Sequence, residues 1–174
     1  RAVCGAAVIK NEARVSVLGI PDRPGISLQI FSAIAAKNVN VDMIVQNVGE
    51  KGLADISFTV PKNELAVTLE SVQQAVNQLG SGTVSHDENV SKVSVVGLGM
   101  AKQSGVAETM FSALAAENVN IQMITTSEIK ISVLVDRDAA QSALRGIHRA
   151  FELDKPSPGG VTPLTAEHAK ADAA

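Results

Sequence analysis

Residues 25–44, with the sequence GISLQIFSAIAAKNVNVDMI, return at residues 105–124 as GVAETMFSALAAENVNIQMI. Eleven of the twenty paired positions are identical, and the offset stays at 80 residues throughout. Upstream, residues 14–19 (RVSVLG) match residues 92–97 (KVSVVG) at an offset of 78, so the second copy has two extra residues after its first strand. Self-similarity at a fixed spacing indicates repeated supersecondary units, and we predict two modules of about 75 residues each.

Both copies show the same order of expected elements. Alternating valines indicate a first strand, apolar residues three and four apart indicate helices, and β-branched stretches indicate further strands. In the first copy we expect strands at 14–19, 41–48, 53–60 and 82–85 and helices at 26–34 and 65–79. In the second copy we expect strands at 92–97, 121–127 and 130–135 and helices at 106–114 and 140–151. The order β-α-β-β-α-β predicts an α+β fold of two tandem ferredoxin-like modules, each an antiparallel sheet with two helices on one face.

The second copy has no fourth strand of its own, because a Pro- and Gly-rich run follows Phe151. Residues 2–10 form a strand-like segment that belongs to neither copy. We therefore predict that this N-terminal strand crosses over and completes the second sheet. A module of this size buries only about 60% of its unfolded surface, so sheets that are shared between modules add stability. The expected divisions are 13–88 for the first module, 1–12 with 89–153 for the second, and 154–174 for a mobile tail.

Composition argues against several classes of function. The chain of 174 residues has a formal net charge of -3, with 45% hydrophobic and 19% charged residues, which is typical of a globular protein. Four Phe are the only aromatic residues and no basic stripe is present, so no nucleic-acid partner is expected. No apolar run approaches the roughly 20 residues of a membrane span, so no membrane partner is expected either. A single cysteine, Cys4, forms no internal disulfide, and we expect a cytoplasmic protein.

The sequence offers no catalytic or metal-binding constellation. It has no GxxxxGK[ST] phosphate loop, no GxSxG nucleophile elbow and no HExxH zinc motif. The three histidines, His86, His148 and His168, are far apart in the chain and are expected to be ordinary surface residues. We therefore predict that this chain by itself has no catalytic residue, no metal and no cofactor.

The best candidate for a ligand site is the loop before the first helix, residues 19–27 (GIPDRPGIS). Pro21 and Pro24 stiffen this loop, and Gly25 permits a close approach to the backbone. The N–H groups of residues 25–27 have no intrahelical partner, and with the helix dipole behind them they suit a ligand carboxylate. Asp22 would take the ammonium of the same ligand, an arrangement that fits an α-amino acid. The alternative is that Asp22 only caps the helix.

The corresponding loop of the second copy, residues 98–105 (LGMAKQSG), is longer and has neither Asp nor Pro. The two copies are therefore not expected to be equivalent binding sites. Polar residues end predicted strands beside the place of a partner module, with Gln46 and Asn47 in the first copy and residues 125–128 in the second.

Several motifs together resemble the ACT modules of aspartate kinases. The first is DRPG at 22–25 after a valine-rich strand, followed by NVNVDMIVQN at 38–47. The second is VSVVGLGM at 93–100, followed by NVNIQMITTSEIKISV at 118–133. The run SEIKIS points to aspartokinases rather than to other ACT proteins. The resemblance covers roughly residues 3–153, and the length suits the small, beta-type regulatory subunit of that family.

The resemblance implies a regulatory function. Aspartate kinases convert aspartate and ATP to 4-phospho-aspartate, the first step of lysine, threonine and methionine biosynthesis, and end products inhibit them. The family's catalytic amino-acid-kinase domain would precede residue 1, so this chain alone is not expected to be an enzyme. The expected partners are a second copy of the chain, joined through the ACT modules, a catalytic subunit or domain, and the effectors threonine, lysine or both. The alternative is a free-standing amino-acid-sensing or dimerisation ACT protein without a kinase partner.

The resemblance also implies two effector sites, each where the first module of one chain meets the second module of another. The first, usually occupied by threonine, would use Asp22, Pro24, Gly25, Ile26, Ser27 and Gln46, with Asn120 and Ile121 from the facing module. The second, of lysine type, would use Met100, Ser104, Gly105, Val106, Ser127 and Glu128, with Asp42 across the interface.

Overall fold

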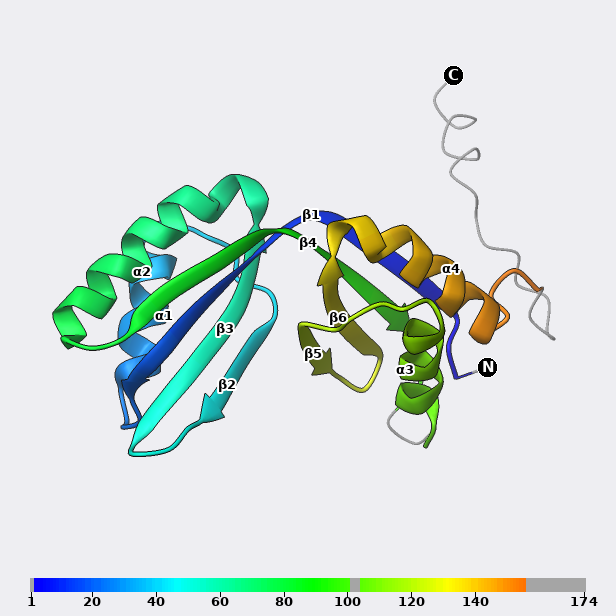
Figure 1. The fold of residues 1–174 in the computed structure, drawn as a ribbon, viewed down its shortest axis with the longest axis horizontal. Helices are drawn as coiled ribbons and strands as arrows, with labels where there is room; N and C mark the ends of the chain where they lie inside the picture. Colours follow the sequence, from blue (N-terminus) through cyan, green and yellow to red (C-terminus); the bar gives the residue numbers. More distant parts are fainter. Residues whose placement is uncertain (1, 101–103, 156–174) are drawn as a thin grey trace, which may run out of the picture.

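The structure is a computed structural model that describes residues 2–100 and 104–155 (Figure 1). Its strands are β1 (Gly5–Pro21), β2 (Ile44–Val48), β3 (Leu53–Pro61), β4 (Thr83–Val96), β5 (Met123–Thr126) and β6 (Lys130–Asp136). Its α-helices are α1 (Ile26–Ala35), α2 (Leu65–Leu79), α3 (Val106–Ala116) and α4 (Ala140–Ala150), and short 3-10 turns at Lys62–Glu64 and Arg137–Ala139 lead into α2 and α4. Of the predicted tail, residues 156–174 lie outside the described residues.

The predicted α+β fold of two ferredoxin-like modules is confirmed, and so is the crossover of the N-terminal strand. Gly5 of β1 lies opposite Val96 of β4, which places the start of the chain in the second half of the sheet. The strand order is β2-β3-β1-β4-β6-β5, and each neighbouring pair is antiparallel. The two expected sheets are in fact one six-stranded sheet, because β1 and β4 each continue through both modules (Figure 1).

The two long strands are paired irregularly near their middles. The pairing of β1 with β4 shifts register between Ile9 and Glu12 and again between Glu12 and Arg14. An extra residue in a strand reverses the alternation of its two faces. In β1, odd-numbered residues such as Val15 therefore face the first core, whereas the even-numbered Val8 packs against the second. These irregularities let one strand serve two sets of helices.

Two hydrophobic cores lie between the sheet and its helices. The first joins α1 and α2 to the sheet, and there Phe31 packs edge-on against Phe58 with ring centroids 5.4 Å apart. The second joins α3 and α4 to the sheet, and Gly146 of α4 permits close contact with α3.

A third, smaller cluster joins the two modules. It consists of Met43, Val90, Met123 and Leu134, with Val45 packed against it. The repeat is visible here, since Met43 and Met123 occupy equivalent positions in the two copies.

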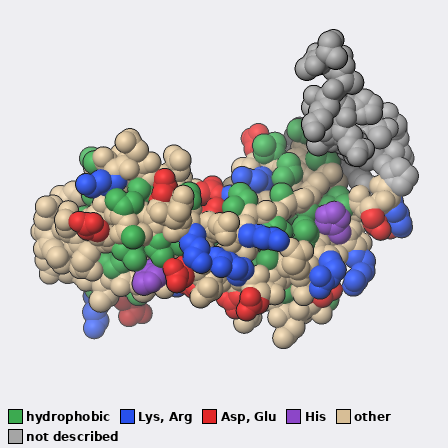
Figure 2. All heavy atoms as spheres, turned by 90° about the horizontal axis from the view of Figure 1, so that it is seen from above, with side chains coloured by type: hydrophobic (Ala, Val, Ile, Leu, Met, Phe, Trp, Pro, Cys, Tyr) green, Lys and Arg blue, Asp and Glu red, His purple; other side chains and the backbone are tan. Residues whose placement is uncertain are grey.

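Seen from above, the molecule has two lobes, and Lys and Arg side chains gather over the narrower middle (Figure 2). β2 and β5 are the first and last strands of the sheet, so each leaves one edge without a neighbouring strand. Among the described residues, no helix is both long and apolar enough to cross a membrane.

Candidate functional site

The loop between β1 and α1 has the backbone that its sequence predicts. Gly25 has a φ of 92°, in the left-handed region that favours glycine, and α1 begins at the next residue. The N–H of Asp22 donates to the carbonyl of Gly52 at 2.9 Å, which fixes the loop to the β2–β3 turn. No side chain in the described part of the chain caps α1. The alternative interpretation, in which Asp22 serves as the helix cap, is therefore wrong.

The first turn of α1 lies beside β2. The hydroxyl of Ser27 donates to the side-chain oxygen of Gln46 at 2.9 Å, and both groups are at the surface. Asp22, Pro24 and Gly25 are also exposed. Ile26 is different, because its side chain is buried in the first core at 4% exposure. Of the predicted contact residues in this module, Ile26 can therefore offer a ligand only its backbone.

Asn120 and Ile121 lie in the other module, in the turn between α3 and β5. No hydrogen bond of the described residues joins them to the loop that contains Asp22. Ser27 and Gln46 thus stand at the open β2 edge, and Asn120 and Ile121 precede the open β5 edge. Within one chain, the structure brings together only the first-module part of the predicted threonine site.

The residues predicted for the second site are also divided. Ser104, Gly105 and Val106 lie at the start of α3 and line a cavity of about 390 Å³, which Ala150 and Phe151 also line. Met100 is buried in the second core.

The other predicted residues of this site lie elsewhere. Ser127 and Glu128 are in the tight β5–β6 turn, where the Ser127 N–H donates to the Lys130 carbonyl at 2.8 Å. Asp42 is in the other module, so the described residues do not assemble the complete set within a single chain.

Asp42 has a partner that the sequence did not predict. Its carboxylate forms an ion pair with the ammonium of Lys92, which lies on β4 and is almost fully buried. The equivalent positions in the repeat are also linked, since Arg14 Nη1 donates to Gln122 Oε1 at 2.8 Å. A signal was present in the sequence, because Arg14 and Lys92 are the matched cations that open the two copies.

Glu12 lies next to this ion pair. It is 6% exposed, and its Oε2 has no hydrogen-bond partner among the described residues. Burial raises the pKa of Glu12 above its usual 4.5, the positive charge of Lys92 opposes that rise, and the negative charge of Asp42 adds to it. A buried acid between two modules is therefore held near one cation and one other acid.

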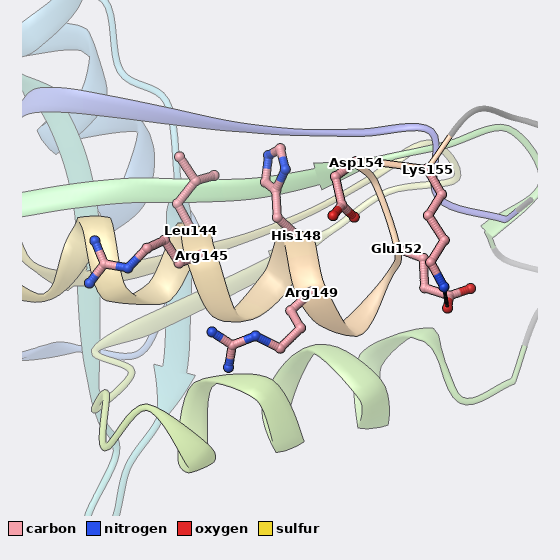
Figure 3. A pocket seen from close by; sticks show the side chains of 7 residues that line it. All are labelled: Leu144, Arg145, His148, Arg149, Glu152, Asp154 and Lys155. Carbon is pink, nitrogen blue, oxygen red and sulfur yellow. Dashed lines mark hydrogen bonds and ion pairs between the residues drawn. The ribbon is translucent and has the colours of Figure 1, made fainter.

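A pocket beside α4 contains none of the predicted site residues. It has a volume of about 610 Å³ and is lined by Leu144, Arg145, His148, Arg149, Glu152, Asp154 and Lys155 (Figure 3). Several of its charges pair with neighbours: Arg149 contacts Glu117 at 3.4 Å, and Lys155 contacts Glu152 at 2.5 Å. Within residues 2–100 and 104–155, no group of three or more His, Cys, Asp or Glu is placed to hold a metal ion.

Comparison with known proteins identifies the repeat. The family model for the ACT domain matches residues 15–76 and 93–151. An aspartokinase of Helicobacter pylori is 48% identical over 153 residues, which are 88% of this chain and 37% of that protein, so the chain spans little more than a third of this curated relative.

Two solved structures match over the module pair as a whole. The regulatory subunit of aspartate kinase from Thermus thermophilus, in its ligand-free form, has a TM-score of 0.83 and 38% identity, over 87% of this chain and 99% of that one. A chain in a structure of aspartokinase alpha and beta subunits has a TM-score of 0.82 and 48% identity, over 87% of this chain and 100% of that one.

Proposed function

The chain belongs to the ACT domain family and is a regulatory region of the aspartate kinase type, and from that premise we propose that it binds amino-acid effectors at interfaces between its modules. The first effector site would take threonine, the second would take lysine, and either effector would inhibit a catalytic partner. That partner would transfer the terminal phosphate of ATP to aspartate, giving 4-phospho-aspartate.

One observation carries the proposal for the first site: the start of α1 and the side chain of Gln46 are held together at an open sheet edge. The N–H groups at the start of a helix attract a carboxylate. Asp22 stands exposed in the same loop and does not cap the helix, so its charge is available for an ammonium group. The neighbouring Ser27 and Gln46 offer hydrogen-bonding partners for a side-chain hydroxyl, which favours threonine among the amino acids.

A second copy of the chain would complete each site. β2 exposes Ile44 and Val48, and β5 exposes Ile124, so both open edges carry apolar side chains that a partner strand would cover. If β2 of one chain lay beside β5 of its partner, the turn before β5 of that second module would come to the loop that holds Asp22. The lysine-type site would form in the same way from the start of α3, the β5–β6 turn and Asp42.

This kind of regulation requires no chemical reaction at the residues of this chain. An effector that binds between two modules stabilises the arrangement of chains to which it binds more tightly. The catalytic partner is inhibited only by that difference in affinity, typically about 1–3 kcal/mol of coupling.

Titration calorimetry of Asp22→Ala tests the first site. We expect threonine to bind about 5- to 150-fold more weakly, because the variant strands the ammonium of the ligand without its counter-ion. Asp138→Ala is the matched control, since Asp138 is also an exposed acid before a helix, in a part of the second module outside both proposed sites. Equal affinity of the wild type and Asp22→Ala for threonine would remove Asp22 from the site.

A further inference from the structure

Two links join the modules at positions that the repeat makes equivalent. Lys92, from the strand that opens the second copy, pairs with Asp42, which precedes β2 of the first. Arg14, from the strand that opens the first copy, bonds to Gln122, which precedes β5 of the second. Each link therefore ties a central strand to the segment that leads into an open edge of the other module.

The two links differ in the charge of the group that is left without a hydrogen-bond partner in the described part of the chain: a cationic one, Nε of Arg14, at the Arg14–Gln122 link, and an acidic one, Oε2 of Glu12, beside the Lys92–Asp42 link. The Nε2 of Gln122 uses both of its donors, to Asp136 at 2.8 Å and to Asp87 at 3.3 Å, while its Oε1 accepts from Arg14. Beside the other link, between Lys92 and Asp42, there is a second acid. Glu12 is buried beside Lys92 with an oxygen that has no partner in the described part of the chain, and its counterpart in the repeat is the apolar Val90.

We propose that Lys92 is a two-position switch between the modules, with Asp42 as its partner in the arrangement seen here and Glu12 as its second partner. Burial limits what Lys92 can do: it is 6% exposed, and a buried ammonium requires an anionic partner at all times. The side chain of Asp42 is 44% exposed, so it can bind another group at the surface, whereas Glu12 is enclosed and can pair only inside the protein.

The geometry of the sheet puts both acids within reach. Lys92 lies opposite Ile9 and Glu12 lies opposite Val90, so Lys92 and Glu12 are on adjacent strands on either side of a shift in register. The charges of both Lys92 and Asp42 act on the Glu12 carboxyl, which places the three groups close together. A lysine chain has four flexible methylene groups, and its ammonium can turn from one carboxylate to the other without movement of the backbone.

This switch would connect the proposed lysine-type site to the contact between the two modules of one chain, an inference that rests on the proposed function. A ligand ammonium that takes Asp42 would release Lys92, and Glu12 would accept it, so no buried charge is left unpaired. The ion pair between the modules would then be replaced by one within the second module, to which both Glu12 and Lys92 belong. Effector occupancy would thereby alter the contact between the two modules of one chain.

A double-mutant cycle on the full chain without effector tests the switch, using urea unfolding at neutral pH. Asp42→Asn and Glu12→Gln should each change the unfolding equilibrium constant by less than about tenfold, because Lys92 pairs with the acid that remains. In the double variant, the change in the unfolding equilibrium constant should exceed the product of the two single changes by about a hundredfold or more, because the buried ammonium of Lys92 then has no anionic partner. Independent, multiplicative effects would overturn the proposal.

Removal of the cation distinguishes a stranded charge from a general loss of packing. Adding Lys92→Met to the double variant should restore most of the lost stability, or restore folding if the double variant fails to fold, because the stranded charge is gone. No recovery would overturn the proposal.

A matched cycle and a titration complete the test. The cycle of Asp138→Asn with Glu70→Gln, two exposed acids elsewhere, should be multiplicative. Coupling of the same size in that cycle would overturn the assignment to Lys92. Since no effector is present in either cycle, these results are independent of lysine binding, and a separate calorimetric titration with lysine tests the proposed site itself.

Discussion

Substitution of Gly97 by alanine should detach the start of the chain from the second module. A Cβ at residue 97 would lie 2.7 Å from the carbonyl carbon of Ala2 and 3.0 Å from the Cα of Val3. Both are backbone atoms, so the N-terminal segment has to move away. That segment contributes the buried side chain of Val3 and a 2.8 Å hydrogen bond from the Cys4 N–H to the carbonyl of Val96.

The magnitude follows from those two contacts. Burial of a valine stabilises by about 1.5–3 kcal/mol, and a backbone hydrogen bond adds about 0.5–1.5 kcal/mol net. We expect Gly97→Ala to lose about 2–4 kcal/mol, which at this chain length lowers Tm by about 10 °C. Hydrogen exchange at the Cys4 amide should accelerate in parallel.

Scanning calorimetry of Gly97→Ala beside Gly5→Ala measures the effect. Gly5 lies in the same N-terminal strand, and a Cβ there meets no atom within 4 Å, so its substitution should leave Tm nearly unchanged. If the two variants unfolded at the same temperature, that result would contradict the close packing of the N-terminal segment against Gly97.

Three other predictions concern the edges and the charges between modules. If the chain dimerises through its β2 edge as proposed, Ile44→Lys at the start of that edge should weaken the dimer at least about tenfold by sedimentation, since an edge lysine opposes strand pairing. Gln74→Lys, on the exposed face of α2, should leave the dimer unchanged. Because burial raises the pKa of Glu12, its contribution to stability is greatest below pH 4.5 and is lost as pH rises through the higher folded value. In urea unfolding, the stability of Glu12→Gln should therefore match that of the wild type at pH 4 and equal or exceed it at pH 7. A variant whose stability relative to the wild type is lower at pH 7 than at pH 4 would contradict the direction of this pKa shift. Gln122→Leu should destabilise by about 1–3 kcal/mol in thermal scans, because it leaves Arg14 without its acceptor and removes the amide donor that Asp87 and Asp136 share.

The repeat made most of the fold predictable. The paired blocks at 25–44 and 105–124 predict a helix and the start of the following strand in each module, and the structure has α1 with β2 and α3 with β5 there. The continuous sheet was not predicted, because the middles of β1 and β4 are polar, which is typical of breaks between strands. Some of those polar side chains lie beside residues of the other module, Glu12 near Asp42 and Asp87 at Gln122, which no pattern within one copy can reveal.

The candidate site was predictable only in part. The glycine at the start of α1 and the polar end of β2 were visible in the sequence, and Ser27 and Gln46 are indeed in contact. The burial of the Ile26 side chain follows from helical periodicity and could have been anticipated. For the pairing of Asp42 with Lys92, the sequence showed only the matched cations Arg14 and Lys92, because the choice of their partners depends on how the two modules fold against each other.

Titration calorimetry of the wild-type chain with threonine and with lysine, each alone, tests most directly whether this chain senses amino acids. We expect threonine binding near one per chain, and additional lysine binding if the second module forms its own site. Absence of binding by both amino acids would contradict the proposal that this chain senses them through its own modules.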